Sequence, residues 1–153
     1  MATLKFTGLD EYAAQLKKIE ANTDEIIGKA IYKGASEMAD SIRSAMQTIP
    51  VDDSYHRPGE ISKGPKSAEK ESRMSGFGIS KLKQTGTFWN VKIGFRGRGP
   101  GGIYNSLIAR QVESGTSWMM KNPFMSRTVN SNKSKCEETM KQVFDEEMEK
   151  LVR

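Results

Sequence analysis

Residues 104–124, YNSLIARQVESGTSWMMKNPF, set the direction of the last third of the chain. They hold an apolar segment that ends at Glu113, a Gly-Thr-Ser turn, a Trp-Met-Met triplet and an Asn-Pro pair. Asn122 is a favoured residue at a helix N-cap, and Pro123 suits the first helical position, where its missing N–H has no intrahelical partner. The segment therefore predicts a short helix, a chain reversal at Gly115 and a second helix that begins at Pro123.

The closing helix is predicted to run from Pro123 to about Leu151. Apolar residues recur at helical spacing in its second half; they are Cys136, Met140, Val143, Phe144, Met148 and Leu151. Its first half includes TVNSNKSK, residues 128–135, which is rich in poor helix formers. We therefore expect a kink or an exposed stretch in the first half of this helix.

Two further helices are predicted in the first third of the chain. One is expected to begin near Leu9, and Asn22 followed by Glu25 resembles a capping box that would start a separate helix. From there an unbroken apolar stripe runs through residues 23–49. Ahead of both helices, residues 4–7 alternate between apolar and polar and predict one short strand.

The middle of the chain predicts an antiparallel hairpin. Phe77 and Ile79 begin one strand, and after Thr85-Gly86 apolar residues alternate with polar residues or glycine from Trp89 to Phe95. Together the elements predict an α+β fold in which a small antiparallel sheet of three or four strands packs against the long 23–49 helix and the long C-terminal helix. A chain of 153 residues is long enough for a single domain.

Residues 51–76 interrupt this pattern with a polar segment of mixed charge. Pro58, Gly59, Gly64 and Pro65 break it, and its apolar residues fit no regular period. The segment is predicted to be a long loop, mobile in the isolated protein.

The net charge of +5 is concentrated in the middle of the chain, because residues 51–100 carry 10 basic and 5 acidic side chains. A localised basic patch suits nucleic acid, an acidic protein partner or a solvated loop. A nucleic-acid-binding module would use the 81–98 region, with its lysines and the two arginines Arg96 and Arg98.

No motif predicts catalysis, a cofactor or a metal. Cys136 falls on the apolar stripe of a helix, where a thiol acts as a small hydrophobe, and His56 lies in the polar insertion. One Cys and one His cannot make a structural zinc site. The loop RGRGPGG, residues 96–102, lacks the Lys-Ser/Thr ending of a P-loop and the βαβ context of a dinucleotide site. We expect a protein that is not an enzyme, without a membrane span or a secretory signal.

A family resemblance rests on Val-Glu-x-Gly-Thr-Ser at residues 112–117, followed by Pro123 and Phe124 at the start of a long helix. This pattern resembles the small neck or tail-completion proteins of long-tailed bacteriophages, often called minor tail components. Ser114 stands where that family usually has an aromatic residue.

The resemblance implies a virion structural protein of the neck, assembled in the cytoplasm of the host bacterium. It would complete the tail and join it to the head connector as a ring, expected to be a hexamer, in contact with connector and tail tube proteins. Genomic DNA would pass through the ring. The expected assembly interface is Arg96, Arg98, Glu113, Gly115, Thr116, Trp118, Met119, Met120, Pro123 and Phe124.

The apolar triplet Trp118, Met119 and Met120 allows two interpretations. Exposed apolar residues in a turn often mark an interface, and Met adapts its shape to a partner. Alternatively, the two Met side chains tuck under the C-terminal helix.

Overall fold

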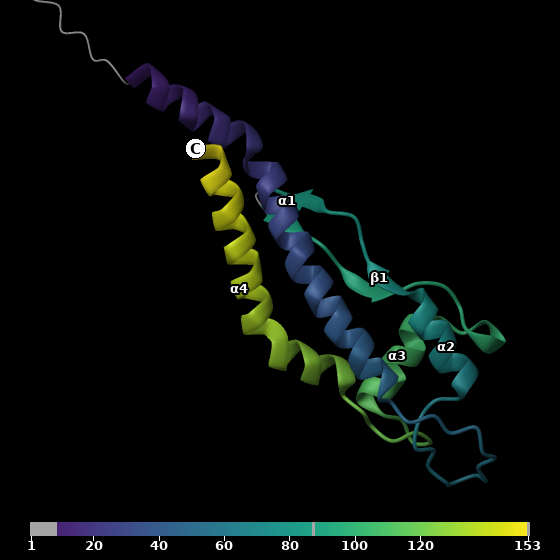
Figure 1. Cartoon of the computed structure of the whole chain (residues 1–153). Helices are drawn as coiled ribbons and strands as arrows, with labels where there is room; N and C mark the ends of the chain where they lie inside the picture. The colour runs from purple at the N-terminus through teal and green to yellow at the C-terminus, as the bar shows by residue number, and fades with distance from the viewer. Residues whose placement is uncertain (1–8, 87, 153) are drawn as a thin grey trace, which may run out of the picture.

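Two long helices form the body of the protein (Figure 1). The structure, a computed structural model, describes residues 9–86 and 88–152, so the predicted strand at residues 4–7 lies outside the described residues. Helix α1 spans Leu9–Gln47 and helix α4 spans Phe124–Val152. They pack along much of their length, and a Cβ atom on Gly34 would overlap the Met140 side chain. Glycine therefore leaves room for the Met140 side chain against α1 at this point.

Helix α1 replaces the two helices that the sequence predicted. Asn22 Nδ2 donates to the Lys18 carbonyl oxygen at 2.7 Å, and Thr23 Oγ1 donates to the Ile19 carbonyl oxygen at 2.6 Å. Both side chains bond to the preceding turn of helix instead of capping a new one. The predicted capping box at Asn22 is therefore wrong.

Helix α4 is continuous but bends in its first half, where the sequence predicted a kink or an exposed stretch (Figure 1). Thr128 and Ser131 donate side-chain hydrogen bonds to the carbonyl oxygens four residues before them, and so does Asn132. Such bonds to the preceding turn bend helices. The bend follows from the same residues that made the helix prediction weak here.

The predicted hairpin is present, but its strands form two separate pairs. Strand β1 (Phe77–Ile79) pairs antiparallel with β4 (Ile93–Phe95), with Phe77 opposite Phe95. Strand β2 (Lys83–Thr85) pairs antiparallel with β3 (Phe88–Asn90). The α+β class is confirmed, whereas the structure divides the expected sheet of three or four strands into two sheets of two strands.

Tyr32 of α1 marks the interruption between the two strand pairs. Its hydroxyl accepts a hydrogen bond from the Leu82 backbone N–H at 2.7 Å and donates one to the Ser80 carbonyl oxygen at 3.2 Å. These bonds satisfy backbone groups that a continuous ladder would otherwise pair. The hairpin is thereby anchored to α1 at its middle.

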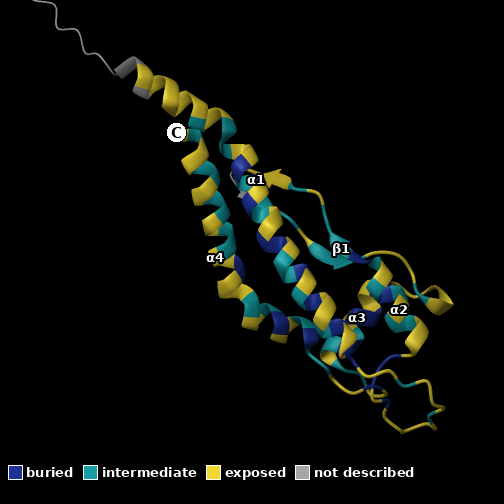
Figure 2. Ribbon diagram, viewed as in Figure 1, coloured by how far each residue is buried: buried dark blue, intermediate teal, exposed yellow. Residues whose placement is uncertain are grey.

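The core lies at the end of the molecule where α1 finishes and α4 begins (Figure 2). It joins α1, β1, the start of α4 and helix α3 (Asn105–Ser114), which follows a short 3₁₀ turn at Pro100–Gly102. Its buried members are Ala39, Ile42, Met46, Ile49, Phe77, Ala109, Val112, Met119 and Phe124. The predicted apolar stripe of the 23–49 helix thus supplies much of the core.

The insertion at 51–76 is only partly a loop. Residues 51–66 have no regular helix or strand, but helix α2 spans Ser67–Gly76. The prediction of a loop is therefore wrong for 67–76, while its mobility stays a prediction. Arg73 of α2 is 1% exposed and its Nε and Nη1 have no hydrogen-bond partner among the described residues. Burial lowers the pKa of Arg73, an effect that nearby Glu69 opposes.

Candidate functional site

The turn after α3 is held by backbone hydrogen bonds. Gly115 ends the helix with φ 73 and ψ 166, and its N–H donates to the Gln111 carbonyl oxygen at 2.8 Å. The Thr116 N–H donates to the Met119 carbonyl oxygen at 3.0 Å, and Thr116 Oγ1 accepts from the Trp118 N–H at 3.3 Å. The predicted reversal at Gly115 is therefore confirmed, and Thr116 serves the turn itself.

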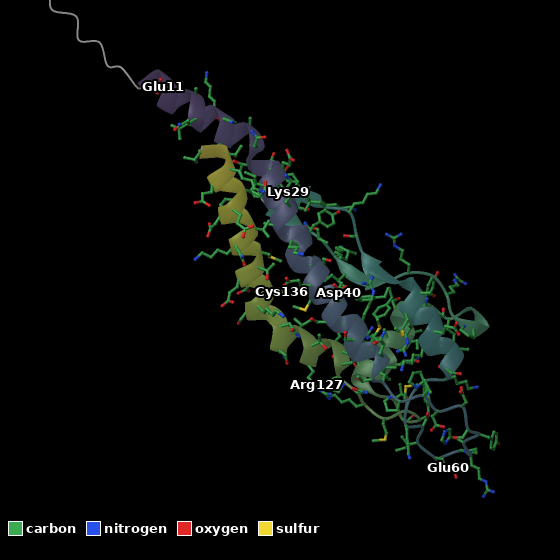
Figure 3. The ribbon with its side chains drawn as sticks, viewed as in Figure 1. Glu11, Lys29, Asp40, Glu60, Arg127 and Cys136 are labelled. Carbon is green, nitrogen blue, oxygen red and sulfur yellow. The ribbon has the colours of Figure 1, made fainter. Side chains whose placement is uncertain are left out.

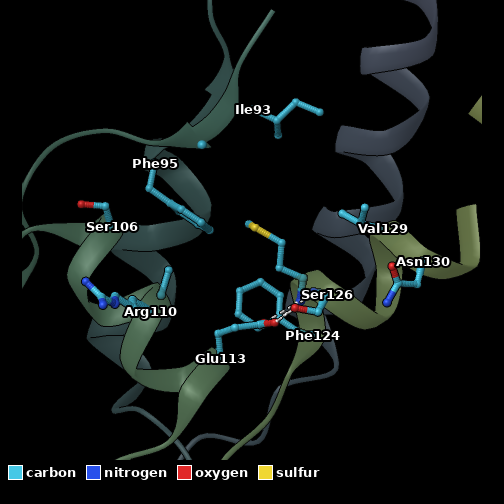
Figure 4. Close-up of a pocket in the computed structure, with 12 residues that line it drawn as sticks. Ile93, Phe95, Ser106, Arg110, Glu113, Phe124, Ser126, Val129 and Asn130 are labelled. Carbon is cyan, nitrogen blue, oxygen red and sulfur yellow. Dashed lines mark hydrogen bonds between the residues drawn. The ribbon is translucent and has the colours of Figure 1, made fainter. Parts of the chain in front are cut away.

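Glu113, which the sequence assigned to an interface, caps the start of α4. Its carboxylate accepts the backbone N–H groups of Met125 at 2.9 Å and Ser126 at 3.0 Å, and it also accepts the Ser126 hydroxyl (Figure 4). A carboxylate at this position satisfies unpaired N–H groups and interacts favourably with the helix dipole. The predicted cap, Asn122, instead donates its backbone N–H to the Val112 carbonyl oxygen, and α4 begins at Phe124 rather than Pro123.

Partial burial raises the pKa of Glu113, but the hydrogen bonds from Ser126 and Met125 outweigh it, so the pKa lies below its usual value. A depressed carboxylate pKa gives stability that is present above the unfolded pKa and is lost as the pH falls through the folded pKa. We expect Glu113→Gln to lower the free energy of unfolding by about 1 kcal/mol at pH 7. Thermal melts should show that this difference shrinks toward acid.

The matched control is Glu20→Gln, because Glu20 is exposed on α1 and makes no ion pair among the six that join described residues. Its melting temperature should follow the wild type from pH 7 down to acid. If the stability lost in Glu113→Gln stays constant over the same pH range, Glu113 does not act as an electrostatic cap.

The turn is joined to the insertion through Ser62. The Ser62 N–H donates to the Trp118 carbonyl oxygen at 2.7 Å, and the Met120 N–H donates to the Ser62 carbonyl oxygen at 2.9 Å. These bonds fix which side chains of the triplet point inward. Met119 is 7% exposed and belongs to the core, whereas Trp118 and Met120 are each 56% exposed. The second interpretation therefore holds for Met119 and not for Met120, and an interface at Trp118 and Met120 stays a prediction.

The joined segments carry a broad apolar surface, which we call the turn–insertion surface. One hollow of ≈ 710 Å³ is lined by Tyr55, Ile103 and Trp118, and a neighbouring one is lined by Ile61 and Met120. The turn–insertion surface holds five of the large apolar side chains that are exposed in the described chain; they are Tyr55, Ile61, Ile103, Trp118 and Met120. Sequence reasoning missed the members outside the triplet, although apolar residues within the polar segment at 51–61 were a usable signal.

The other expected interface residues lie elsewhere. Phe124 is 3% exposed and packed in the core, and Pro123 is half-buried. Arg96 and Arg98 are exposed, and the Arg98 guanidinium carbon lies 4.4 Å from the centre of the Tyr104 ring while Nη2 donates to the Tyr104 hydroxyl at 2.7 Å. The structure therefore brings Trp118 and Met120 together as a surface and assigns Glu113, Met119 and Phe124 to the fold.

A third hollow, of ≈ 620 Å³, opens between β4, α3 and the start of α4 (Figure 4). Its walls are mainly apolar, and Arg110 and Glu113 are its charged lining residues. Because Glu113 is engaged with the α4 backbone, Arg110 supplies the remaining charge in this lining.

The group of Ser54, His56 and Asp52 in the insertion does not have the geometry of a catalytic triad. His56 Nε2 lies 2.9 Å from Asp52 Oδ2 and 3.3 Å from Ser54 Oγ, so the carboxylate and the hydroxyl meet the same ring nitrogen. A triad needs them at opposite nitrogens so that a proton can pass through the ring. Hydrogen bonds from Ser54 and the Lys63 N–H hold the pKa of Asp52 well below its usual value, which fits a carboxylate that shapes the loop.

Cys136 and His56 are also far from forming a catalytic pair. Cys136 is buried where α4 packs on α1, and burial raises its pKa. His56 belongs to the loop at 51–66, whose Glu60 lies beyond the start of α4 in Figure 3. Across residues 9–86 and 88–152, no three His, Cys, Asp or Glu side chains gather in a way that could hold a metal ion. Within the same ranges no helix combines the length and apolar character needed to cross a membrane.

Comparison with known proteins gives no relative: the chain matches no protein-family model, no curated protein and no solved structure.

Proposed function

We propose that this chain is a structural protein of a bacteriophage neck, which completes the tail and joins it to the head connector as a ring. The sequence pattern of residues 112–124 supports the proposal, because it resembles that of tail-completion proteins. The ring would hold six copies, contact connector and tail tube proteins, and leave an axial passage for genomic DNA. It would act in the neck of the virion after assembly in the bacterial cytoplasm.

The observation that carries the proposal is the turn–insertion surface. Trp118 and Met120 are exposed although the adjacent Met119 is buried, and the backbone bonds to Ser62 hold all three in place. An apolar surface of this breadth, held by a fixed backbone, is typical of a protein–protein contact. Aromatic residues and Met are also enriched where such contacts are tightest.

The experiment compares the wild type with a double variant, Trp118→Ser with Met120→Ser. Because both side chains are about half exposed, the thermal transition of the monomer should change little. Electron micrographs of the purified wild type should show rings, and incubation with purified tails of the same phage should show them at the tail end. The double variant should form at least tenfold fewer rings, both alone and at the tail end.

The matched control is Leu16→Ser, a similarly exposed apolar residue on α1 and 49% exposed. Control rings should form as in the wild type. Wild-type protein that forms no rings and never binds tails would exclude the neck function.

The basic hairpin supports an alternative function, a nucleic-acid-binding module. Lys81, Lys83 and Lys92 are exposed with Arg96 and Arg98, and none of the five forms an ion pair with a described residue. Such side chains could contact phosphates. A salt titration separates the two functions: submicromolar DNA binding with a steep salt slope at near-physiological salt would favour the alternative.

A further inference from the structure

The hairpin presents positive charge with no negative charge nearby in the sequence. Residues 72–112 contain no Asp or Glu. We call the five exposed cations of the hairpin region the basic hairpin surface; they are Lys81, Lys83, Lys92, Arg96 and Arg98. Such a surface attracts a partner of opposite charge.

The outer face of the second half of α4 has the opposite character. Its exposed carboxylates, which we call the acidic α4 face, are Glu137, Glu138, Asp145, Glu146 and Glu149, against two exposed cations, Lys141 and Lys150. Glu138 and Asp145 line a shallow hollow on this face. The inner face of the same helix packs on α1 through Met140. The acidic face is therefore an outward-facing helix surface in the described chain.

The second half of α4 and the hairpin lie on opposite sides of α1 (Figure 1). Gly28 and Tyr32 of α1 face the hairpin, where a Cβ on Gly28 would lie 3.0 Å from Leu82. Gly34 and Glu37 face α4, where Thr139 donates to Glu37 at 2.8 Å. With α1 between them, the basic hairpin surface cannot reach the acidic α4 face of its own chain.

We propose that the basic hairpin surface of one copy docks on the acidic α4 face of the next copy. The contact joins two different patches, so it is head-to-tail and closes into a ring when its rotation allows. This inference rests on the proposed ring function and adds to it which surfaces meet. Charge complementarity would guide the encounter and fix the order of subunits.

A second copy suits the hairpin better than nucleic acid does. Single-stranded nucleic acid is held by aromatic side chains that stack on bases. Phe77 is buried in the core, Phe95 packs against it at 5.2 Å between ring centres, and Trp89 is half-buried. The exposed ring of Tyr104 is covered on one face by Arg98. In its described part, the hairpin therefore presents mainly charged side chains to a partner.

The test uses two charge-reversed variants of the full chain. The hairpin variant carries Lys83→Glu and Lys92→Glu, and the helix variant carries Glu138→Lys and Asp145→Lys. All four side chains are exposed, so circular dichroism melts should resemble the wild type. Sedimentation velocity at about 50 mM salt should show wild-type oligomers and a loss of association of at least tenfold in each variant alone.

Mixing the two variants in equal amounts should restore the oligomers, because the new glutamates of one variant then meet the new lysines of the other. An alternating ring of this kind needs an even number of subunits. A chain that carries all four substitutions should also assemble. Neutral variants, Lys83→Gln with Lys92→Gln, keep the test valid if a reversed variant unfolds; they should weaken association without abolishing it.

Three results would overturn the inference: a wild type that stays monomeric at low salt, variants that assemble as the wild type does, or a mixture that stays dissociated. A further outcome is that rings survive charge reversal but disappear in the Trp118→Ser, Met120→Ser variant. That result would contradict this inference alone and would still support the neck function. Normal assembly of the hairpin variant with loss of duplex DNA binding would assign the basic hairpin surface to nucleic acid instead.

Discussion

Met119→Asp is expected to destabilise the fold strongly, whereas Met120→Asp is expected to leave the monomer stable. Met119 is 7% exposed and packs in the core, while its neighbour is 56% exposed. Placing a carboxylate without a partner in the core costs about 3–5 kcal/mol. For a chain of this size that loss corresponds to a fall in melting temperature on the order of 10 °C.

Melts at a concentration where both variants are monomeric provide the measurement. Met120→Asp is the internal control, since it adds the same charge one residue away and should shift stability by no more than about 0.5 kcal/mol. It should nevertheless reduce ring formation, because it places a charge on the turn–insertion surface. Equal destabilisation by the two substitutions would contradict the division of the triplet into core and surface.

Gly115→Val is the second substitution expected to have a large effect on folding. Gly115 has φ 73 and ψ 166, a combination that is essentially confined to glycine. A Cβ atom there would also lie 2.9 Å from Lys121 Cβ and 3.0 Å from the Lys121 backbone nitrogen. Strain and contact together should lower the free energy of unfolding by roughly 3 kcal/mol or more, because the return of the chain along α3 depends on this turn.

Gly101→Val is the milder comparison. Gly101 also has a positive φ, 75°, but its ψ of 8° lies in the left-handed helical region, and a Cβ atom there would meet nothing within 4 Å. It should cost about 1–2 kcal/mol, from backbone strain alone. Chemical denaturation of both variants gives the comparison, and a Gly115→Val loss no larger than that of Gly101→Val would show that neither the ψ of Gly115 nor the contact with Lys121 adds to the loss.

Much of the secondary structure could be predicted from local sequence. The apolar stripe at 23–49 and the spacing of Cys136 and Met140 predicted the two long helices, because helical periodicity is a property of the sequence itself. Alternation predicted the pairing of β1 with β4, and glycine predicted the reversal at residue 115. Each of these signals depends on residues that are near one another in the chain.

The misses share a physical cause, which is competition for backbone hydrogen bonds. Asn22 had the residue type of a cap, but its amide bonds to the preceding turn. Asn122 also had the residue type of a cap. The first N–H groups of α4 nevertheless donate to Glu113, which belongs to another helix. Tyr32 in the same way occupies backbone groups where the hairpin ladder is interrupted. Local residue type gives the candidates for a cap, and only the fold decides which one is used.

The candidate site shows the same division between what local sequence predicts and what tertiary contacts decide. The sequence by itself determined that a tight turn carries an apolar triplet ahead of a helix, and that positive charge gathers in the middle of the chain. Only the tertiary structure decided that Met119 enters the core while Trp118 and Met120 stay outside, because that choice depends on the backbone bonds to Ser62. It likewise decided that Tyr55 joins them, since a contact between segments some 60 residues apart leaves no trace in local periodicity.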